Sequence, residues 1–216
     1  MFMRKDNITT GEMFDTLITV LINYDRYKDI LQKTPHRRFL DLALVPVLIN
    51  DFYIENSYEF IDNSCIENMD IDSELFMDLA YFNYGRKMGT KVISMFDYMK
   101  PFDNELYSEN LSYVEASPDI SKSIYILSNK YLLYGAAAMC NKELLDQMGR
   151  YLKSDYYIIP SSINELLIFP DEYLIGEADC KEMIKYVNTY GLDSPGQYLS
   201  DNLYKYDASE QKLYIA

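Results

Sequence analysis

The chain has 216 residues, with 34 Asp or Glu against 20 Lys or Arg, which gives a formal net charge of -14. This length predicts one domain, or two small ones, with a substantial hydrophobic core. Apart from short pairs such as Arg37-Arg38 the cations are scattered, so the charge argues against direct binding of nucleic acid and favours another protein, including a basic one, as partner.

The cysteines indicate the compartment. Cys65, Cys140 and Cys180 are odd in number and widely spaced, and they form neither a CxxC pair nor a zinc-ligand pattern. We find no signal-peptide core and no apolar run of the ~20 residues that a membrane span requires. These features predict a cytoplasmic protein with free thiols, without metal or cofactor, and without membrane association.

Tyrosine is enriched, with 22 Tyr against 10 Phe and no Trp. The ring of tyrosine packs while its hydroxyl reaches water, so we expect most of these residues at half-buried positions between core and surface. A tyrosine-rich contact surface for a protein partner is the alternative.

The N-terminal elements are predicted from apolar spacing. Thr9-Thr10-Gly11-Glu12 is typical of a capping box, and apolar residues at three- and four-residue spacing from Phe14 to Leu31 predict one long helix. Pro35 would end it. Residues 39–49 predict a strand, which Pro46 would place at a sheet edge or a bulge.

The middle of the chain is mixed. Residues 52–54 are compatible with a short strand, and a helix is predicted over 73–88, capped by Asp72, ended by Gly89, and carrying an apolar face. That face consists of Leu75, Leu79 and Phe82. Residues 91–99 are compatible with helix or strand, and the acidic stretch 100–123 predicts a loop or linker.

The C-terminal half has clearer patterns. Strands are predicted at residues 124–127, 134–139, 156–159 and 166–170, followed by a hairpin of strands 204–206 and 213–215. Helices are predicted after Asn141 and Asp179 as caps. The strands are too close in sequence for helical crossovers, so we expect an α+β fold of mostly antiparallel sheet with helices packed on one side.

We therefore expect three regions: a helix–strand–helix region over residues 1–99, a linker over 100–123, and an α+β region over 124–216. The two ordered regions could form closely packed subdomains.

Several segments together resemble a known family. They are Pro35–Ala43, Tyr125–Lys130, Tyr134–Ala138, Pro160–Glu165 and Leu199–Asp207. The chain resembles domain-of-unknown-function family 5688, over roughly residues 10–50 and 73–207. The resemblance implies an origin in anaerobic Gram-positive bacteria, often in accessory genomes, and a form shortened at the N-terminus. It implies no activity, because none is established for the family.

Ser161-Ser162-Ile163-Asn164-Glu165, a polar turn between two predicted strands, is the first candidate site. The resemblance implies a histidine where this chain has Asn164, so a proton-transfer role for that position is not expected here. A serine nucleophile needs a base, and Glu165, if it lies on a strand, would point to the opposite face. A turn that satisfies local backbone groups is the expected role, and a small polar binding niche is the alternative.

Arg37 and Arg38, next to the only histidine, His36, are the second candidate. Their guanidinium groups could grip a carboxylate or phosphate, although we expect them to pair with neighbouring acids in so acidic a chain. Acidic clusters such as 51–59 and 70–74 lack the ligand layout of a calcium loop. No phosphate-binding glycine motif occurs.

The sequence thus favours a protein-binding module without catalytic residues. An acidic inhibitor that imitates nucleic acid, and a hydrolase centred on residues 161–165, are the alternatives. The binding residues expected from sequence are Ser161, Ser162, Asn164, Glu165, Arg37 and Arg38.

Overall fold

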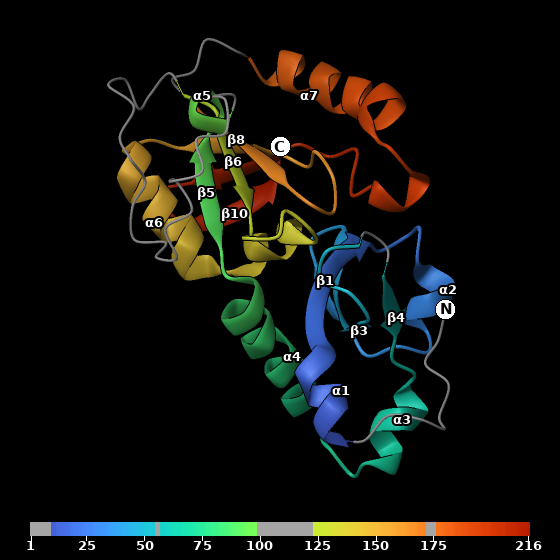
Figure 1. Ribbon diagram of the computed structural model, residues 1–216. Helices are drawn as coiled ribbons and strands as arrows, with labels where there is room; N and C mark the ends of the chain where they lie inside the picture. The colour runs from blue at the N-terminus through green and yellow to red at the C-terminus, as the bar shows by residue number, and fades with distance from the viewer. Residues whose placement is uncertain (1–9, 55–56, 99–122, 172–175) are drawn as a thin grey trace. The chain divides into compact units, whose positions relative to one another are not determined.

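The computed structural model describes residues 10–54, 57–98, 123–171 and 176–216 (Figure 1). The chain divides into two compact units, Met1–Gly89 and Thr90–Ala216. Each unit contains one sheet, and every strand pairing in the described residues is antiparallel. The predicted α+β class is confirmed. The predicted boundaries at 99 and 124 remain a prediction, and residues 100–122 of the predicted linker lie outside the described residues.

The first unit alternates short helices and strands. Its elements are α1 (Thr10–Thr16), β1 (Leu17–Asn23), α2 (Lys28–Leu31), β2 (Arg37–Phe39), β3 (Leu42–Ile49), β4 (Tyr58–Phe60), α3 (Asn63–Asn68) and α4 (Ser73–Met88). In its sheet β3 pairs with β1 from Leu42 to Leu48, and with β2 and β4 one after the other.

The prediction of one helix from Phe14 to Leu31 is wrong. The chain forms α1, then the strand β1, then the single turn of α2. All residues from Leu17 to Ile22 are buried, so the segment is a continuous buried run in which helical spacing can always be found. The β-branched residues in this run favour the strand, which is completed by pairing with β3. Thr9 of the predicted capping box lies outside the described residues.

The strand predicted over residues 39–49 is present as β3, but it is central and not at the edge. Pro46 is tolerated because β2 pairs with residues 42–44 and β4 with residues 47–49. Pro46 therefore falls between two partner strands, where the ladder is already interrupted. Residues 52–54 form a turn and not the short strand considered from the sequence.

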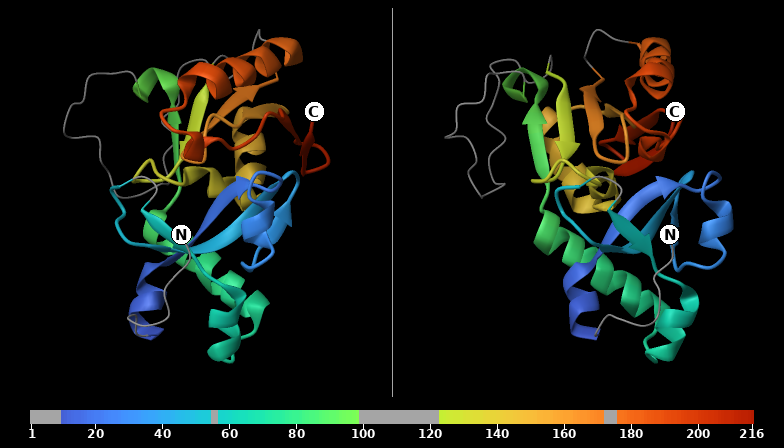
Figure 2. Two further views of the ribbon diagram at one scale, coloured as in Figure 1. Left: turned by 90° about the vertical axis from the view of Figure 1, so that its right-hand side faces the viewer. Right: turned by 45° about the vertical axis from the view of Figure 1, so that its right-hand side comes forward.

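Helix α4 begins and ends where the sequence predicts. The Asp72 carboxylate accepts a hydrogen bond from the backbone N–H of Leu75 at 3.0 Å, and Gly89 ends the helix with a φ of 64°. The helix runs alongside β1 (Figures 1 and 2). Its covered face is formed by Phe76, Met77, Ala80, Asn83, Tyr84 and Met88. The apolar face predicted from the sequence lies elsewhere on the helix and is described below.

The second unit contains a sheet of six strands in the order β10-β9-β7-β8-β6-β5. Its elements are β5 (Lys91–Ser94), α5 (Met95–Tyr98), β6 (Tyr125–Ser128), the 3-10 helix η2 (Gly135–Cys140), α6 (Lys142–Leu152), β7 (Tyr156–Ile159), β8 (Leu166–Pro170), α7 (Glu177–Tyr186), the π-helical η3 (Val187–Gly191), the 3-10 turn η4 (Pro195–Gln197), β9 (Tyr204–Asp207) and β10 (Lys212–Ile215). The strands predicted on both sides of residues 161–165 and the C-terminal hairpin are confirmed.

Two element predictions in this unit are corrected. Residues 134–139 were expected to form a strand, but Tyr134 adopts a left-handed conformation with φ of 58° and the 3-10 helix η2 follows it. The helix predicted after Asp179 begins three residues earlier, at Glu177. Asp179 caps it from within the first turn, where its carboxylate accepts from the N–H of Gly176 at 3.1 Å.

A helix covers each face of this second sheet, whereas one covered face was expected. On one face Cys180 and Ile184 of α7 pack in a cluster with Phe169 and other strand residues. On the other face Tyr156 donates a hydrogen bond from its hydroxyl to the carbonyl oxygen of Leu145 in α6, at 3.0 Å. Alternate residues of each strand point to opposite faces, so a short apolar strand can pack side chains against a helix on each face of the sheet.

Tyrosines fill the core of the second unit. Those with fully buried side chains are Tyr125, Tyr134, Tyr156, Tyr204 and Tyr206. The rings of Tyr156 and Tyr206 stack with centroids 4.9 Å apart. The expectation that tyrosines lie mainly at half-buried positions is therefore wrong for this group, in which the hydroxyls of Tyr156 and Tyr206 find hydrogen-bond partners inside the fold.

Candidate functional site

The polar turn at residues 161–165 is held to neighbouring segments by hydrogen bonds. The carbonyl oxygen of Asn164 accepts from the N–H of Gly135 at 3.0 Å and from the Ser128 hydroxyl at 2.7 Å. Its side-chain oxygen accepts from the N–H of Tyr134 at 3.0 Å. The Ser162 hydroxyl in turn accepts from the N–H of Asn164 at 3.1 Å. These bonds tie the turn to the start of η2, as the turn interpretation of this segment predicts, and a binding role for Ser162 and Asn164 remains a prediction.

Ser161 and Glu165 lie on the same side of this turn. The Ser161 hydroxyl lies 3.4 Å from a carboxylate oxygen of Glu165, so the expectation that Glu165 points away is wrong. Strand alternation does not apply, because residues 160–165 form an irregular turn. This distance is longer than the roughly 2.7–2.8 Å of a typical O–H···O hydrogen bond. Burial raises the pKa of the Glu165 carboxyl, and the Ser161 hydrogen bond only partly opposes this.

The raised pKa of Glu165 predicts a pH dependence of stability. Because the folded state binds this proton more tightly than the unfolded chain, the group stabilises the fold at low pH. That stability is lost as pH rises above the carboxyl's ordinary value of 4.5 and through its raised folded value. Glu165→Gln should therefore be more stable than the wild type at neutral pH, with the difference shrinking toward acid. Urea unfolding at a series of pH values measures this.

The matched control is Glu182→Gln, which removes an exposed carboxyl on α7. It should leave the pH dependence of the unfolding free energy close to that of the wild type. If Glu165→Gln and Glu182→Gln show the same pH dependence, the proposed burial of Glu165 is wrong.

Arg37 and Arg38 belong to the first unit and are both engaged there. The Arg37 guanidinium binds Glu74 and Asp78 of α4, with nitrogen–oxygen distances of 2.7 and 2.8 Å. Arg38 donates to the carbonyl oxygen of Leu40 and lies over the Tyr24 ring, 4.0 Å from its centroid. The expected pairing with neighbouring acids is thus present for Arg37, which fastens β2 to α4. A ligand-gripping role for either arginine remains a prediction.

His36, the only histidine of the chain, has its Nδ1 within 3.0 Å of the carbonyl oxygen of Thr34. Since a carbonyl can only accept, Nδ1 carries the proton in this contact.

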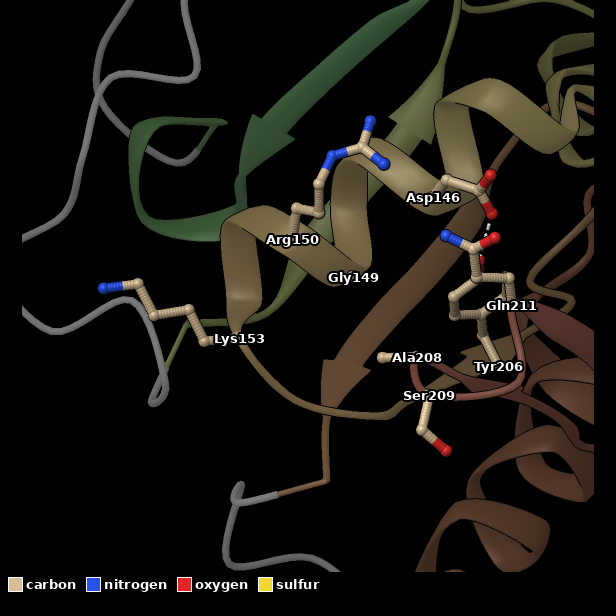
Figure 3. Close-up of a pocket in the computed structure, with 8 residues that line it drawn as sticks. All are labelled: Asp146, Gly149, Arg150, Lys153, Tyr206, Ala208, Ser209 and Gln211. Atoms are coloured by element: carbon tan, nitrogen blue, oxygen red, sulfur yellow. Dashed lines mark hydrogen bonds between the residues drawn. The ribbon is translucent and has the colours of Figure 1, made fainter.

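A pocket of about 300 Å³ lies in the second unit between α6 and the β9–β10 turn (Figure 3). The buried Tyr206 donates a hydrogen bond to the carboxylate of Asp146. Burial raises the pKa of Tyr206 well above its ordinary value, and Asp146 raises it further. The phenol therefore stays protonated at neutral pH. The remaining lining residues are Gly149, Arg150, Lys153, Ala208, Ser209 and Gln211.

This pocket contains none of the residues singled out from the sequence. Arg150 and Lys153 are exposed, and in Figure 3 the Lys153 side chain extends away from Ala208 and Ser209. The two cations therefore do not converge on one point. The pocket is for this reason a weaker candidate binding site than its two positive charges suggest.

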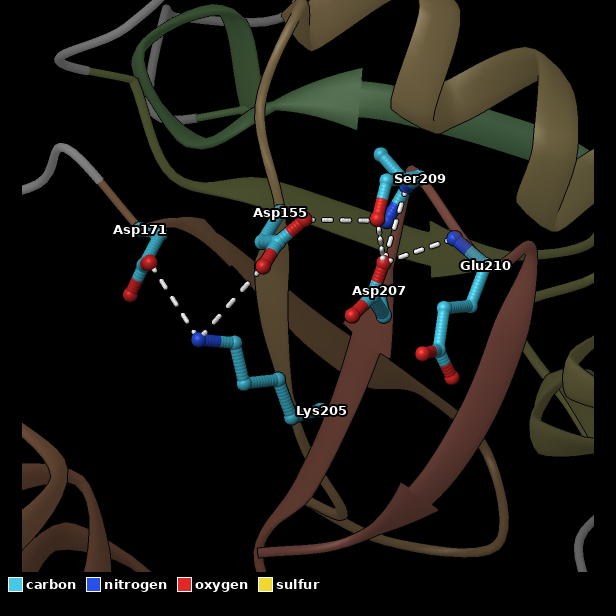
Figure 4. Close-up of polar contacts among 7 residues, drawn as sticks. Asp155, Asp171, Lys205, Asp207, Ser209 and Glu210 are labelled. Atoms are coloured by element: carbon cyan, nitrogen blue, oxygen red, sulfur yellow. Dashed lines mark hydrogen bonds and ion pairs between the residues drawn. The ribbon is translucent and has the colours of Figure 1, made fainter.

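Near the pocket, carboxylates hold the β9–β10 hairpin in place (Figure 4). Lys205 lies between Asp155 and Asp171, at nitrogen–oxygen distances of 3.6 and 3.2 Å. The Asp207 carboxylate accepts from the N–H groups of Ser209 and Glu210, both at 2.8 Å. These hydrogen bonds lower the pKa of Asp207, and they fix the turn that the sequence predicts at this position.

The outward face of α4 is the strongest candidate binding surface. Leu75, Leu79 and Phe82 follow at four- and three-residue spacing and so form one stripe, here called the outer stripe. Leu75 is 54% exposed and Phe82 is 67% exposed. The residues that α4 buries, among them Phe76 and Ala80, lie on its other side. A helix that is apolar on two faces, only one of which is covered, has an apolar face left for a partner.

The sequence indicated the outer stripe as the apolar face of α4, but not the second apolar set on the same helix. The signal was present, because Phe76, Met77, Ala80, Tyr84 and Met88 have their own helical spacing. Two such sets on one helix indicate burial from two sides.

A second exposed aromatic group lies at the end of α7. Tyr186 and Tyr190 are 65% and 76% exposed, and their ring centroids are 5.3 Å apart. Aromatic residues in exposed pairs suit protein contacts, although this pair is smaller than the outer stripe.

Within the described ranges, no three or more His, Cys, Asp or Glu side chains gather closely enough to hold a metal ion. None of the helices described here has the length and apolar character needed to cross a bilayer.

The fold and these surfaces define the chain as an acidic α+β protein of two units, with an uncovered apolar helix face on the first. By its sequence the chain belongs to the Family of unknown function (DUF5688), whose model matches residues 4–208. The family resemblance noted above is thereby confirmed. Comparison with curated proteins gave no match, and comparison with solved structures gave none either.

Proposed function

We propose that the chain is a protein-binding module, that it acts without catalysing a reaction, and that the outer stripe of α4 is its contact surface. The observation that carries the proposal is the high exposure of Leu75 and Phe82 on a helix whose opposite face already packs in the core. Leaving two large apolar side chains in water is unfavourable by about 1.5–3 kcal/mol each relative to full burial. A partner that covers them gains this energy.

The hydrolase alternative finds less support. Ser161 meets a carboxylate at 3.4 Å, but the described contacts of Glu165 include no further group that would orient it as a base. Ser162 is buried and its hydroxyl bonds the local backbone. The serines therefore serve the turn in the contacts that the structure describes.

The inhibitor alternative requires carboxylates that are available to a basic enzyme. Several acids are instead bound within the chain: Glu74 and Asp78 hold Arg37, and Asp155 and Asp171 hold Lys205. These pairs favour an apolar contact surface over an acidic one. The free thiols of Cys65, Cys140 and Cys180 support the cytoplasm as the place of action.

The test places a photo-reactive benzoylphenylalanine at position 82 in living cells. We expect a covalent adduct of defined mass. Leu75→Asp in the same chain should abolish it, because burying an unpaired carboxylate in an apolar contact is unfavourable. The same probe at Gln147, an exposed position on α6, is the control and should give no such adduct. Equal adducts at both positions, or an adduct that survives Leu75→Asp, would contradict the proposal.

A further inference from the structure

We propose that the outer stripe of α4 binds a second copy of this chain, with the two α4 helices antiparallel about a two-fold axis near Leu79. This inference rests on the proposed function and specifies its partner. It follows from the order of residues along α4, from the charge at the two ends of the helix, and from the exposed Gly85 beside the stripe.

The outer stripe is self-complementary when it is reversed. Leu75 and Phe82 are seven residues apart, which is about 10.5 Å along a helix, and Leu79 lies between them. Turning a second α4 by 180° about Leu79 brings Leu75 of one copy opposite Phe82 of the other, and brings the two Leu79 side chains together. A two-fold contact of this kind uses the same patch twice and closes on itself. A parallel arrangement would instead place Phe82 against Phe82, about a two-fold axis that runs along the helices.

The charges along α4 favour the same orientation. Glu74 and Asp78 are already paired with Arg37, and Lys87 with Asp15, so the charges available to a partner near the two ends of the helix are Asp72 and the exposed Arg86. In the antiparallel pair the basic end of one helix lies over the acidic end of the other, whereas a parallel pair would place like charges together. The exposed Arg86 lies on the stripe side of the helix, 11 positions after Leu75, and so reaches the first turn of the partner.

Gly85 lies beside the stripe and adds no side chain to this surface. A Cβ atom built on Gly85 meets nothing within 4 Å, and Gly85 is exposed. A residue without a side chain at this position lets another helix approach closely.

The size of the contact determines its strength. One helix of 16 residues is about 24 Å long, and its single stripe offers less than the ~800 Å² per partner of a standard stable interface. We therefore expect a reversible dimer with a dissociation constant of about 10–100 µM, which forms and separates with concentration.

Sedimentation velocity from about 5 µM to about 500 µM tests the proposal across this range. The wild type should shift from monomer to dimer, and Phe82→Asp should remain monomeric with unchanged helix content by circular dichroism. Tyr190→Asp, a matched change at an exposed aromatic residue of the second unit, should dimerise like the wild type. A wild type that stays monomeric throughout, or a dimer that persists in Phe82→Asp, overturns the second copy as partner.

Orientation is tested by disulfide formation between two differently tagged chains. In the antiparallel pair, Leu75→Cys on one chain should cross-link to Phe82→Cys on the other at least ten times faster than Leu75→Cys cross-links to itself. The native thiols of the wild-type chain provide the background rate. Faster self-linking of Leu75→Cys would contradict the antiparallel arrangement.

The two proposals can fail separately. If the wild type is monomeric but the probe at position 82 still gives an adduct lost in Leu75→Asp, the stripe binds a different protein and only the second copy is wrong. If neither dimer nor adduct is found, the proposed function is wrong as well.

Discussion

Gly135→Ala should destabilise the second unit by about 3 kcal/mol or more, at the upper end of what overpacking costs. A Cβ atom at this position would lie 2.2 Å from the Ser128 hydroxyl oxygen, 2.5 Å from the carbonyl oxygen of Asn164 and 2.6 Å from Cα of Ser128. Two of these three atoms belong to the backbone and cannot turn away. Relief would require η2 to separate from the polar turn, which would break the bonds that Gly135 and Ser128 make to Asn164.

Peptide-resolved hydrogen exchange measures this effect unit by unit. Amides of β6, β7 and β8 should lose protection in Gly135→Ala. Gly176→Ala serves as the control in the same unit, because its new Cβ would meet only Asp179 at 3.6 Å, an ordinary contact distance. Equal protection in the two variants would show that η2 does not approach the turn as closely as the structure indicates.

Phe76→Ala should lower the stability of the first unit by about 3–5 kcal/mol, because it removes a fully buried ring and leaves a cavity. Phe76 packs with Leu17, Leu48 and Ala80, which join α4 to β1 and β3. Its ring also lies 6.5 Å, centroid to centroid, from that of Phe14. Loss of the ring therefore weakens the contact of α4 with the whole sheet.

Phe82→Ala is the matched control, since it removes the same side chain from the same helix. Phe82 is 67% exposed, so the free energy of unfolding of the monomer should change by less than about 0.5 kcal/mol. Urea unfolding at low protein concentration compares the two variants. A cost for Phe82→Ala close to that for Phe76→Ala would mean that the outer stripe is covered within the chain, and would contradict its role as a contact surface.

The helices and turns that the sequence predicted correctly are those with local chemical signals. Asp72 and Asn141 cap helices because their side chains accept hydrogen bonds from N–H groups three residues later, at 3.0 and 3.1 Å. Asp207 organises its turn in the same way. Such bonds join residues two or three positions apart, so the residue type and its position contain the information needed to predict them.

The elements that were predicted wrongly depend on distant partners. Residues 17–22 are apolar except for Thr19 and satisfy helical and extended spacing alike, and they form a strand because β3 supplies the ladder. Residues 135–140 form a 3-10 helix because Gly135 and Ala136 donate to the turn at residues 163–164 and not to a strand. Neither partner can be identified from the local sequence.

For the candidate surfaces too, some features follow from the local sequence and others only from the packing. The sequence showed that Leu75, Leu79 and Phe82 share an apolar helix face, but it did not show whether that face is buried. Only the packing of Phe76 and its neighbours against the sheet shows which face remains open. For the polar turn the reverse applies: the sequence indicated Ser161–Glu165 as a place of interest, and the structure shows the Ser162 hydroxyl and the Asn164 amide bonded to the backbone.

The sequence by itself determined the α+β class, the acidic charge, the family and the helix caps, because composition and near-neighbour hydrogen bonds are properties of short segments. The tertiary structure decided which of two apolar faces of α4 is buried, which continuous apolar run is a strand, and how Glu165 comes to face Ser161. The physical reason is that burial and sheet pairing are set by residues far apart in the chain, and an apolar side chain satisfies a core and a contact surface equally well until its neighbours are known.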